Sequence, residues 1–252
     1  MTNLHPGFRW SSASVTDAGR VRQVNEDACL ERPDIGLWAV ADGVGGHEAG
    51  DLASRTVVQA LDSTPVPLFM GQAVADLRRR LLEANHRLRS EADRRGQGII
   101  GSTVALLVAL HDHCTFLWVG DSRVYRLRGR ALQRLSRDHS QVEDLIDQGL
   151  LDRRAAENHP AANVITRAVG AAEVLEIDAQ TLQIKDGDCF LLCTDGLTKE
   201  VSEREIAAAL SGSDVVDAVP ALIDLACDRG ARDNVTAVAI RFSAEGTRTP
   251  GG

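Results

Sequence analysis

The chain has 252 residues, with 28 Lys or Arg against 36 Asp or Glu, so its formal net charge is −8. This acidic balance argues against a nucleic-acid partner, because neutralising phosphates requires a basic surface. The longest aliphatic run, Val104 to Leu110, is far shorter than the ~20 residues needed to cross a bilayer. The first residues show no basic segment followed by an apolar one, so we expect no signal peptide, no membrane partner and a cytoplasmic location.

Five cysteines are spread through the chain and form no Cys-x-x-Cys pair. Their odd number and mostly apolar surroundings predict buried thiols in a reducing compartment, rather than disulfides or a zinc site. They are Cys29, Cys114, Cys189, Cys193 and Cys227.

Apolar patterning predicts the elements in chain order. Runs of β-type residues indicate strands at 8–15, 37–41, 103–110, 115–119, 123–128, 131–135, 174–182, 188–193 and 234–242. Apolar residues spaced by three and four indicate helices at 48–61, 72–95 and 214–227. Pro220 lies inside the last helix and is expected to kink or split it. The Gly, Thr and Pro content of residues 243–252 predicts a disordered tail.

Short connections join the four predicted strands between residues 103 and 135. Parallel strands need long crossovers, so these short links favour an antiparallel meander. Several strands are apolar at successive positions and need cover on both faces. We therefore predict an α+β fold, in which helices pack outside two antiparallel sheets.

Four carboxylates lie at strand ends. Asp42 follows the run LWAVA, Asp195 follows FLLCT, Asp121 follows FLWVG, and Asp233 precedes the strand NVTAVAIRF. Carboxylates gathered at one rim would repel one another unless a cation neutralised them. Oxygen ligands suit Mg²⁺ or Mn²⁺, so the pattern predicts a site for these ions.

Other interpretations exist for each residue. Asp-Gly is a common turn dipeptide, which is how we interpret Asp186-Gly187 and which remains an alternative for Asp42 and Asp195 individually. The glycine-rich segment after Asp42 has Glu48 where a dinucleotide-binding loop needs Gly, so Gly43 is better explained as a backbone carbonyl that can approach a metal.

Arg22 lies four residues before Glu26 and five before Asp27. An arginine so placed can form a salt bridge, or it can grip a phosphate with its planar guanidinium.

Taken together, these residues closely resemble the motifs of the metal-dependent protein Ser/Thr phosphatases of type 2C (the PPM family), in their bacterial form. Any one motif is weak, but seven in the family's order are specific, and the resemblance runs from about residue 11 to residue 242. The motifs are Thr16-Asp17-x-Gly19-x-x-Arg22-x-x-Asn25-Glu26-Asp27, Ala41-Asp42-Gly43-x-Gly45-Gly46-His47, Gly101-Ser102-Thr103, Gly120-Asp121-Ser122-Arg123, Asp138-His139-Ser140, Thr194-Asp195-Gly196-Leu197 and Asp233-Asn234-x-Thr236.

The resemblance implies a single domain over residues 1–242, folded as a four-layer αββα sandwich of two antiparallel β-sheets flanked by helices. It also implies two Mn²⁺ or Mg²⁺ ions, with a third in bacterial relatives. Asp42 would bridge two ions and position the nucleophilic water, and Arg22 would bind the substrate phosphate. The remaining implied ligands are the carbonyl of Gly43, Asp195, Asp233, Asp121 for the third ion, and Glu26 and Asp27 through water.

The chain departs from the family pattern at one position. Eukaryotic relatives carry a histidine, thought to be the general acid, where this chain has Val44. His47 is three residues further on and could transfer a proton or orient the loop. Residues 141–163 resemble the family's flap and contain two short helical patterns with many charges, which suits either a specificity element or a solvated surface.

The implied activity is hydrolysis of phosphoserine and phosphothreonine in proteins, by attack of a metal-bridging water or hydroxide. A covalent route lacks a candidate, because no Cys-x5-Arg pattern occurs in the chain. We expect a monomer that opposes a bacterial Ser/Thr kinase in signalling. A partner-binding pseudophosphatase and a phosphohydrolase of small molecules are the alternatives. Manganese uptake and substrate preference would distinguish them.

Overall fold

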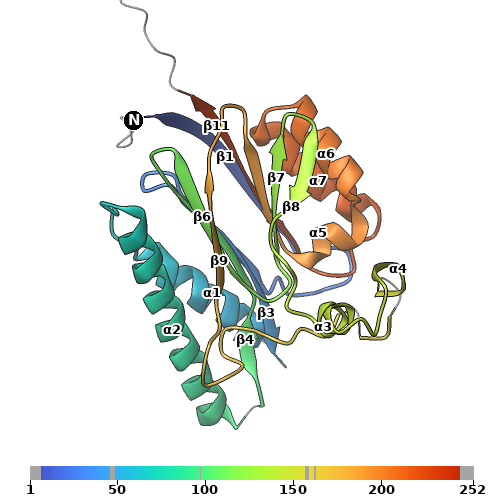
Figure 1. Cartoon of the computed structure of the whole chain (residues 1–252). Helices are drawn as coiled ribbons and strands as arrows, with labels where there is room; N and C mark the ends of the chain where they lie inside the picture. Colours follow the sequence, from blue (N-terminus) through green and yellow to red (C-terminus); the bar gives the residue numbers. More distant parts are fainter. Residues whose placement is uncertain (1–6, 46–48, 97, 157–158, 162, 245–252) are drawn as a thin grey trace, which may run out of the picture.

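The computed structural model describes residues 7–45, 49–96, 98–156, 159–161 and 163–244, and two antiparallel sheets lie face to face at its centre (Figure 1). The first sheet has the order β1-β11-β10-β7-β8. Its strands are β1 (Phe8–Asp17), β7 (Arg123–Arg128), β8 (Ala131–Arg134), β10 (Cys189–Cys193) and β11 (Val235–Ala244).

The second sheet has the order β2-β3-β5-β6-β9, and the short strand β4 pairs with the end of β3. Its strands are β2 (Asp27–Arg32), β3 (Leu37–Gly45), β4 (Ile100–Ser102), β5 (Val104–Leu110), β6 (His113–Val119) and β9 (Asp178–Gln183).

Helices cover the outer faces of both sheets. On the second sheet lie α1 (Ala49–Asp62) and α2 (Met70–Arg95), and on the first lie α5 (Asp195–Glu200), α6 (Glu203–Gly212) and α7 (Val215–Asp228). The short helices α3 (Gln141–Asp147) and α4 (Arg153–Ala156) lie at one end of the sandwich (Figure 1), and we refer to the segment that contains them as the flap. This arrangement confirms the predicted αββα sandwich.

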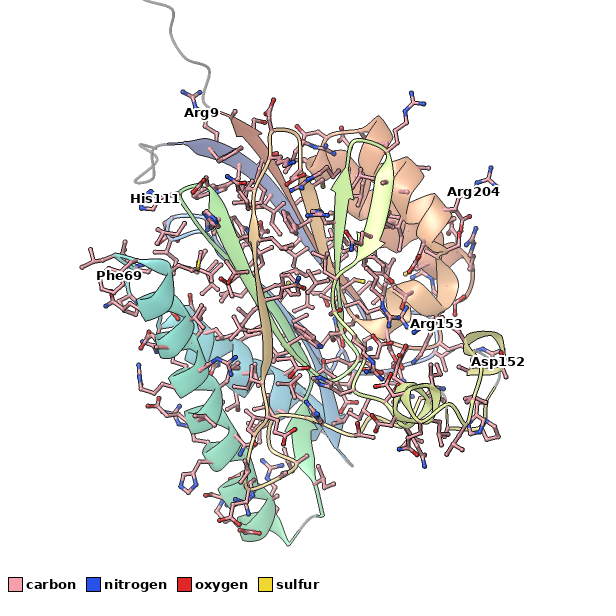
Figure 2. The ribbon with its side chains drawn as sticks, viewed as in Figure 1. Arg9, Phe69, His111, Asp152, Arg153 and Arg204 are labelled. Carbon is pink, nitrogen blue, oxygen red and sulfur yellow. The ribbon has the colours of Figure 1, made fainter. Side chains whose placement is uncertain are left out.

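Three apolar clusters hold the four layers together. One lies between α1, α2 and the second sheet, another between the first sheet and α5 to α7. The third lies between the sheets, where Trp38, Phe190 and Phe242 are fully buried and meet edge to face. Side chains fill these spaces, whereas charged ones such as Arg204 lie at the periphery (Figure 2).

The predicted four-stranded meander is wrong. The chain forms two hairpins in different sheets, since β5 and β6 pair in the second sheet and β7 and β8 in the first. β6 pairs with β9 and not with β7, so β6 and β7 lie in different sheets. Residues Gly120 to Ser122, which join them, therefore cross from the second sheet to the first. A short link sets the direction of the next strand but not the sheet that it joins.

Pro220 does not split its helix. α7 runs as one helix over Val215–Asp228. The proline removes the backbone donor to the carbonyl of Val216, and Val216 is 57% exposed, so water can satisfy that carbonyl.

Several boundaries differ from the prediction; β9, for example, begins at Asp178 and not at residue 174, and two other strands are longer than predicted because they find a partner strand. β3 continues past Asp42 to Gly45, because β4 supplies a partner strand there. β11 continues to Ala244, because Ser243 and Ala244 pair with Arg9 and Phe8, so two residues of the predicted tail are ordered. Residues 245–252 of that tail lie outside the described residues.

Some elements were not predicted. β2 lacks a clear apolar alternation, and α5 is a six-residue helix that begins at an Asp-Gly pair with turn character. Within the described residues, no helix is both long and apolar enough to span a membrane.

Candidate functional site

Acidic side chains from both sheets converge at one end of the sandwich. β2 and β3 place Asp27 directly opposite Asp42. Asp121 lies in the crossover between the sheets, Asp195 is the first residue of α5, and Asp233 lies just before β11. Burial, and then the negative charges of its neighbours, raise the pKa of Asp42 well above its usual range; those neighbours are Asp27, Asp195, Asp121 and Asp233. The structure thus brings together the four carboxylates predicted from strand ends, and adds Asp27.

Asp27 is held from the other sheet. Its Oδ2 accepts hydrogen bonds from the hydroxyls of Thr236 (2.7 Å), in β11, and Thr194 (2.8 Å), directly after β10. Burial raises the pKa of Asp27 to about 7 even though these two hydroxyls lower it, and the charges of Asp195 and Asp233 add to the rise. Its Oδ1 is buried with no hydrogen-bond partner among the described residues. Thr194 and Thr236 therefore fix one oxygen and leave the other available to a cation.

Asp42 is fixed through its backbone. Its N–H donates to Oγ1 of Thr103 (3.0 Å), and its carbonyl accepts from the N–H of Thr103 (2.8 Å). The Thr103 hydroxyl also lies 2.6 Å from that of Ser122, in the crossover that carries Asp121. Thr103 thus joins the strand of Asp42 to the segment of Asp121.

Gly43 is a glycine because the first turn of α1 passes over it. A Cβ at this position would lie 2.0 Å from the carbonyl oxygen of Gly50 and 2.7 Å from that of Glu26. Gly50 in turn lies against the Glu26 carboxylate, because a Cβ added at Gly50 would be 2.5 Å from Oε1 of Glu26. The packing of α1, rather than room for a metal, excludes a side chain at Gly43.

Asp121 lies close enough to Asp195 for their charges to interact, and both line the same cavity. Burial raises the pKa of Asp121 to about 7, and the charges of Asp195 and Asp138 add to the rise. Gly120, just before it, has φ +100°, and a Cβ there would lie 2.7 Å from Cγ2 of Thr103. The crossover is therefore packed tightly on Thr103.

Two cations lie against the remaining carboxylates. Lys199 Nζ is 2.6 Å from Oδ2 of Asp195 and 3.2 Å from Oδ2 of Asp233. Arg22 Nη2 is 3.0 Å from Oδ1 of Asp233, so its salt bridge is with Asp233 and not with Glu26 or Asp27. Lys199 was missed from the sequence because its i,i+4 spacing from Asp195 has meaning only if α5 is a helix.

Asn234 fastens the loop that carries Arg22. Its Oδ1 accepts from the N–H of Glu26 (2.8 Å), and its Nδ2 donates to the carbonyls of Ala18 (3.0 Å) and Val24 (3.0 Å). Gly19 has φ +77° and lies so close to the Asp233 carbonyl that a Cβ would be 2.3 Å from the oxygen. The loop is thereby held against Asp233 at both ends.

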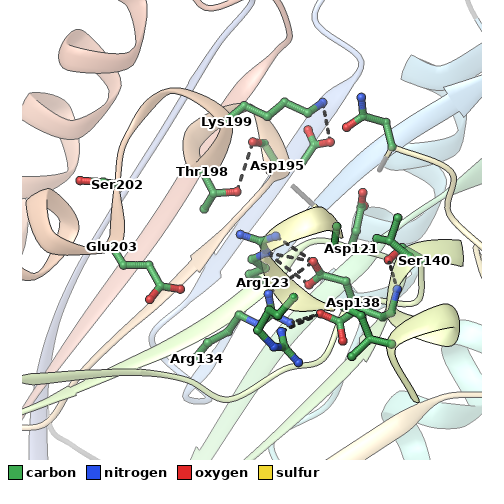
Figure 3. A pocket seen from close by; sticks show the side chains of 16 residues that line it. Asp121, Arg123, Arg134, Asp138, Ser140, Asp195, Thr198, Lys199, Ser202 and Glu203 are labelled. Atoms are coloured by element: carbon green, nitrogen blue, oxygen red, sulfur yellow. Dashed lines mark hydrogen bonds and ion pairs between the residues drawn. The ribbon is translucent and has the colours of Figure 1, made fainter. Parts of the chain in front are cut away.

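A cavity of about 780 Å³ opens beside Asp121 and Asp195 (Figure 3). The flap lines one side and the start of α6 lines the other. Inside it, Arg123 grips Asp138, with Nη2 2.8 Å from Oδ2, and Arg134 and Arg153 both bind the buried carboxylate of Glu143 on α3. Glu203, the first residue of α6, points into the cavity and has no ion-pair or hydrogen-bond partner among the described residues.

The remaining predicted residues contribute less. Val44 is paired with Gly101 and offers no proton-transfer group. His47 lies outside the described residues. Within the described ranges, no three acidic, His or Cys side chains are placed so that they could hold a metal ion together, and Lys199 and Arg22 form ion pairs with Asp195 and Asp233 instead.

Comparison with known proteins identifies the family. The sequence profile described as "Protein phosphatase 2C" matches residues 17–225. The serine/threonine phosphatase stp of Listeria monocytogenes is 33% identical over 249 residues, which cover 94% of this chain and 95% of that protein.

The chain belongs to the protein phosphatase 2C family.

Solved structures of family members agree. PppA, "a key regulatory component of T6SS in Pseudomonas aeruginosa", has 45% identity and a TM-score of 0.86, and the match covers 94% of this chain and 98% of PppA. The catalytic domain of the phosphatase PstP, solved in complex with two manganese ions, has 30% identity and a TM-score of 0.81, with 94% of this chain and 99% of that chain covered. The predicted bacterial protein Ser/Thr phosphatase of the type 2C family is thus confirmed as family and enzyme class.

Proposed function

We propose that this chain is a manganese- or magnesium-dependent phosphatase that removes phosphate from phosphoserine and phosphothreonine in proteins. The observation that carries the proposal is the group of buried carboxylates around Asp42: burial, and then the negative charges of its neighbours, raise the pKa of Asp42, and a bound divalent cation would offset both effects. The PstP neighbour, solved with two manganese ions, supports the same ion chemistry.

The residues present fit such ions. Asp27 Oδ1 and Asp195 Oδ1 are buried without a hydrogen-bond partner among the described residues, which is a costly arrangement unless a bound cation or the water that it carries contacts them. All the donors proposed here are oxygens, the ligands that Mg²⁺ and Mn²⁺ prefer. Asp42, the carbonyl of Gly43, Asp195 and Asp233 would hold two ions, Glu26 and Asp27 would act through water, and Asp121 with Asp195 would serve a third.

Bound ions would activate water and neutralise charge on the phosphoryl group. The chain's own residues do the rest. Thr194 and Thr236 orient Asp27, and Thr103 fixes the backbone of Asp42, so the carboxylates are positioned before substrate arrives. Arg22, which is 51% exposed beside Asp233, can turn its guanidinium fork to the substrate phosphate.

The cavity beside Asp121 would receive the peptide on one side of the phosphorylated residue. The arginines that line it form ion pairs with carboxylates that also line it: Arg123 with Asp138, and Arg134 and Arg153 with Glu143. Glu203 has no ion-pair partner among the described residues. A substrate that places a basic residue there would gain an ion pair. The flap would therefore act as one wall of a specificity site.

The test is release of inorganic phosphate from phosphothreonine peptides. Activity should require Mn²⁺ or Mg²⁺, disappear in chelator, return when the ion is restored, and be lost in Asp42→Asn. Metal uptake without turnover would point to a pseudophosphatase. Faster turnover of nucleotides or sugar phosphates than of peptides would point to a small-molecule enzyme. Activity that survives both chelator and Asp42→Asn would contradict the ion site.

The cellular role proposed here is opposition to a Ser/Thr kinase by a cytoplasmic monomer. Five free cysteines, four of them buried, support a reducing compartment. The 45% identity with PppA favours a regulatory role of the kind named for that protein. Deleting the gene should raise phosphothreonine on the kinase's targets, and wild-type protein, but not Asp42→Asn, should restore the lower level.

A further inference from the structure

The motif Asp138-His139-Ser140 is buried beside the site but holds none of the proposed ions. Its residues are 9%, 7% and 3% exposed. Each side chain fastens a different neighbour. Asp138 binds the guanidinium of Arg123, and Ser140 caps α3, accepting from the N–H of Glu143 at 3.4 Å. His139, between them, reaches the crossover that carries Asp121.

His139 and Gly120 exchange two hydrogen bonds. The N–H of Gly120 donates to Nδ1 of His139 (3.0 Å), and the backbone N–H of His139 donates to the Gly120 carbonyl (2.9 Å). Gly120 therefore has both its polar groups bound by one residue. It is also the residue directly before Asp121, in the segment that passes between the sheets.

The His139 ring is fixed in place on its other sides. It stacks on Trp118 at 6.1 Å between ring centroids, with 15° between the planes. Its Nε2 lies 3.2 Å from Oδ2 of Asp178, at the start of β9. Since Nδ1 accepts from Gly120, the neutral ring must carry its proton on Nε2 and donate it to Asp178.

We propose that His139 is a positioning residue: by accepting from the Gly120 N–H through Nδ1, it sets where the Asp121 carboxylate lies relative to Asp195. This inference rests on the proposed function, in which Asp121 and Asp195 share an ion. Gly120 directly precedes Asp121, so a shift of Gly120 after its N–H loses the Nδ1 acceptor would move the Asp121 backbone, even though the backbone N–H of His139 still binds the Gly120 carbonyl. Residues that orient metal ligands typically change metal affinity 10- to 100-fold when replaced.

Two replacements of His139 separate the hydrogen bond from the bulk of the ring. His139→Asn keeps an acceptor near the place of Nδ1, whereas His139→Gln carries its amide near the place of Nε2 and leaves Gly120 without an acceptor. We expect His139→Gln to weaken manganese binding at the proposed site of Asp121 and Asp195 roughly 10-fold, and His139→Asn to weaken it less. Electron paramagnetic resonance titration with Mn²⁺ measures this without reference to turnover.

A double-mutant cycle with Asp121→Asn tests whether His139 acts through Asp121. In that background His139→Gln should cause little further loss of manganese affinity, because the ligand that it positions is already impaired. Thermal unfolding of each variant shows whether the fold survives. His113→Gln, at the far end of β6, is the matched control and should bind manganese as the wild type does.

Opposite results would overturn the inference. Equal losses in His139→Asn and His139→Gln, or additive losses in the double mutant, would show that His139 only fills space. An Asp121→Asn variant that binds as many ions as the wild type would refute the proposed role of Asp121 and the inference with it. If Asp121→Asn binds fewer manganese ions than the wild type but His139→Gln binds manganese as the wild type does, the inference about His139 alone is refuted.

Discussion

Asp27 and Asp42 lie directly opposite each other on neighbouring strands, and each has a raised pKa in the folded protein. Like charges at opposed positions of a strand pair are destabilising. These two tolerate the arrangement because Thr194 and Thr236 from the other sheet bind Asp27. Protonation of Asp27 and Asp42 therefore affects both the stability of the fold and the binding of cations, so both should depend on pH.

Without divalent ions, the protein should become less stable as pH rises. Burial raises the pKa of Asp27 from its ordinary value of 3.8 to about 7, so the folded state binds this proton more tightly than the unfolded state. Stability from this group is then full below about pH 4, falls as pH rises toward 7, and is lost above it. Melting temperatures in chelator between pH 5 and 8 should fall, and saturating Mn²⁺ should reduce the slope.

Asp42→Asn should remove part of that repulsion. We expect the free energy of unfolding in chelator at pH 7.5 to rise by about 1–2 kcal/mol, or ~2–8 °C in melting temperature. Stabilisation by added Mn²⁺ should disappear in the same variant. Calorimetric melting with and without the ion measures both effects. Asp186→Asn, in a turn away from the site, is the control and should keep its response to Mn²⁺.

Arg22→Ala should impair substrate binding more than ion binding. A charge-assisted hydrogen bond to phosphate is worth enough to lower kcat/KM for a phosphopeptide roughly 10- to 100-fold. Manganese affinity should be unchanged or higher, because Arg22 no longer competes for Asp233. Arg20→Ala, two residues away and exposed, should behave as the wild type. A loss confined to manganese affinity would assign Arg22 a purely structural role.

Glu203→Gln should change selectivity among peptides. The wild type is expected to favour a phosphopeptide with a basic residue beside the phosphothreonine over the same peptide with Ala there, by roughly 2- to 5-fold for an exposed ion pair. The variant should lose that preference and keep its rate on p-nitrophenyl phosphate, which does not reach across the cavity. Glu200→Gln makes the same charge change on α5 outside the cavity and should retain the preference.

Gly43→Ala should be severely destabilising. The new methyl group would meet the Gly50 carbonyl oxygen at 2.0 Å, and both contacting groups are backbone, so neither can move alone. We expect a loss of about 3 kcal/mol or more, with α1 displaced from β3. Gly71→Ala is the contrasting change, since a Cβ there meets nothing within 4 Å and stability should be equal or up to about 1 kcal/mol higher. Urea unfolding compares the two.

Local patterns in the sequence predicted most of the fold. The apolar spacing that runs through Leu77, Leu81 and Leu88 predicted α2, and all three side chains are buried. The strand-end carboxylates predicted that Asp42, Asp121 and Asp195 lie near one another, since buried strands place their last residues at the same end of the sandwich. These signals succeed because each depends on one short segment of chain.

What could not be predicted depends on distant segments. The hairpins β5-β6 and β7-β8 look alike in sequence, and their separation into two sheets depends on β9 and β10, which come about 50 residues later. The pairing of Arg22 with Asp233 has the same origin, because Asn234 brings that loop across from the far end of the chain.

The crossover at Gly120 to Ser122 has a consequence for how the enzyme matures. Because Asp42 belongs to one layer, Asp195 to the other, and Asp121 to the link between them, neither half of the sandwich can assemble the acidic rim on its own. A folding intermediate in which only one sheet has formed would not hydrolyse phosphoproteins. Phosphatase activity would therefore appear only after both sheets had formed and packed together.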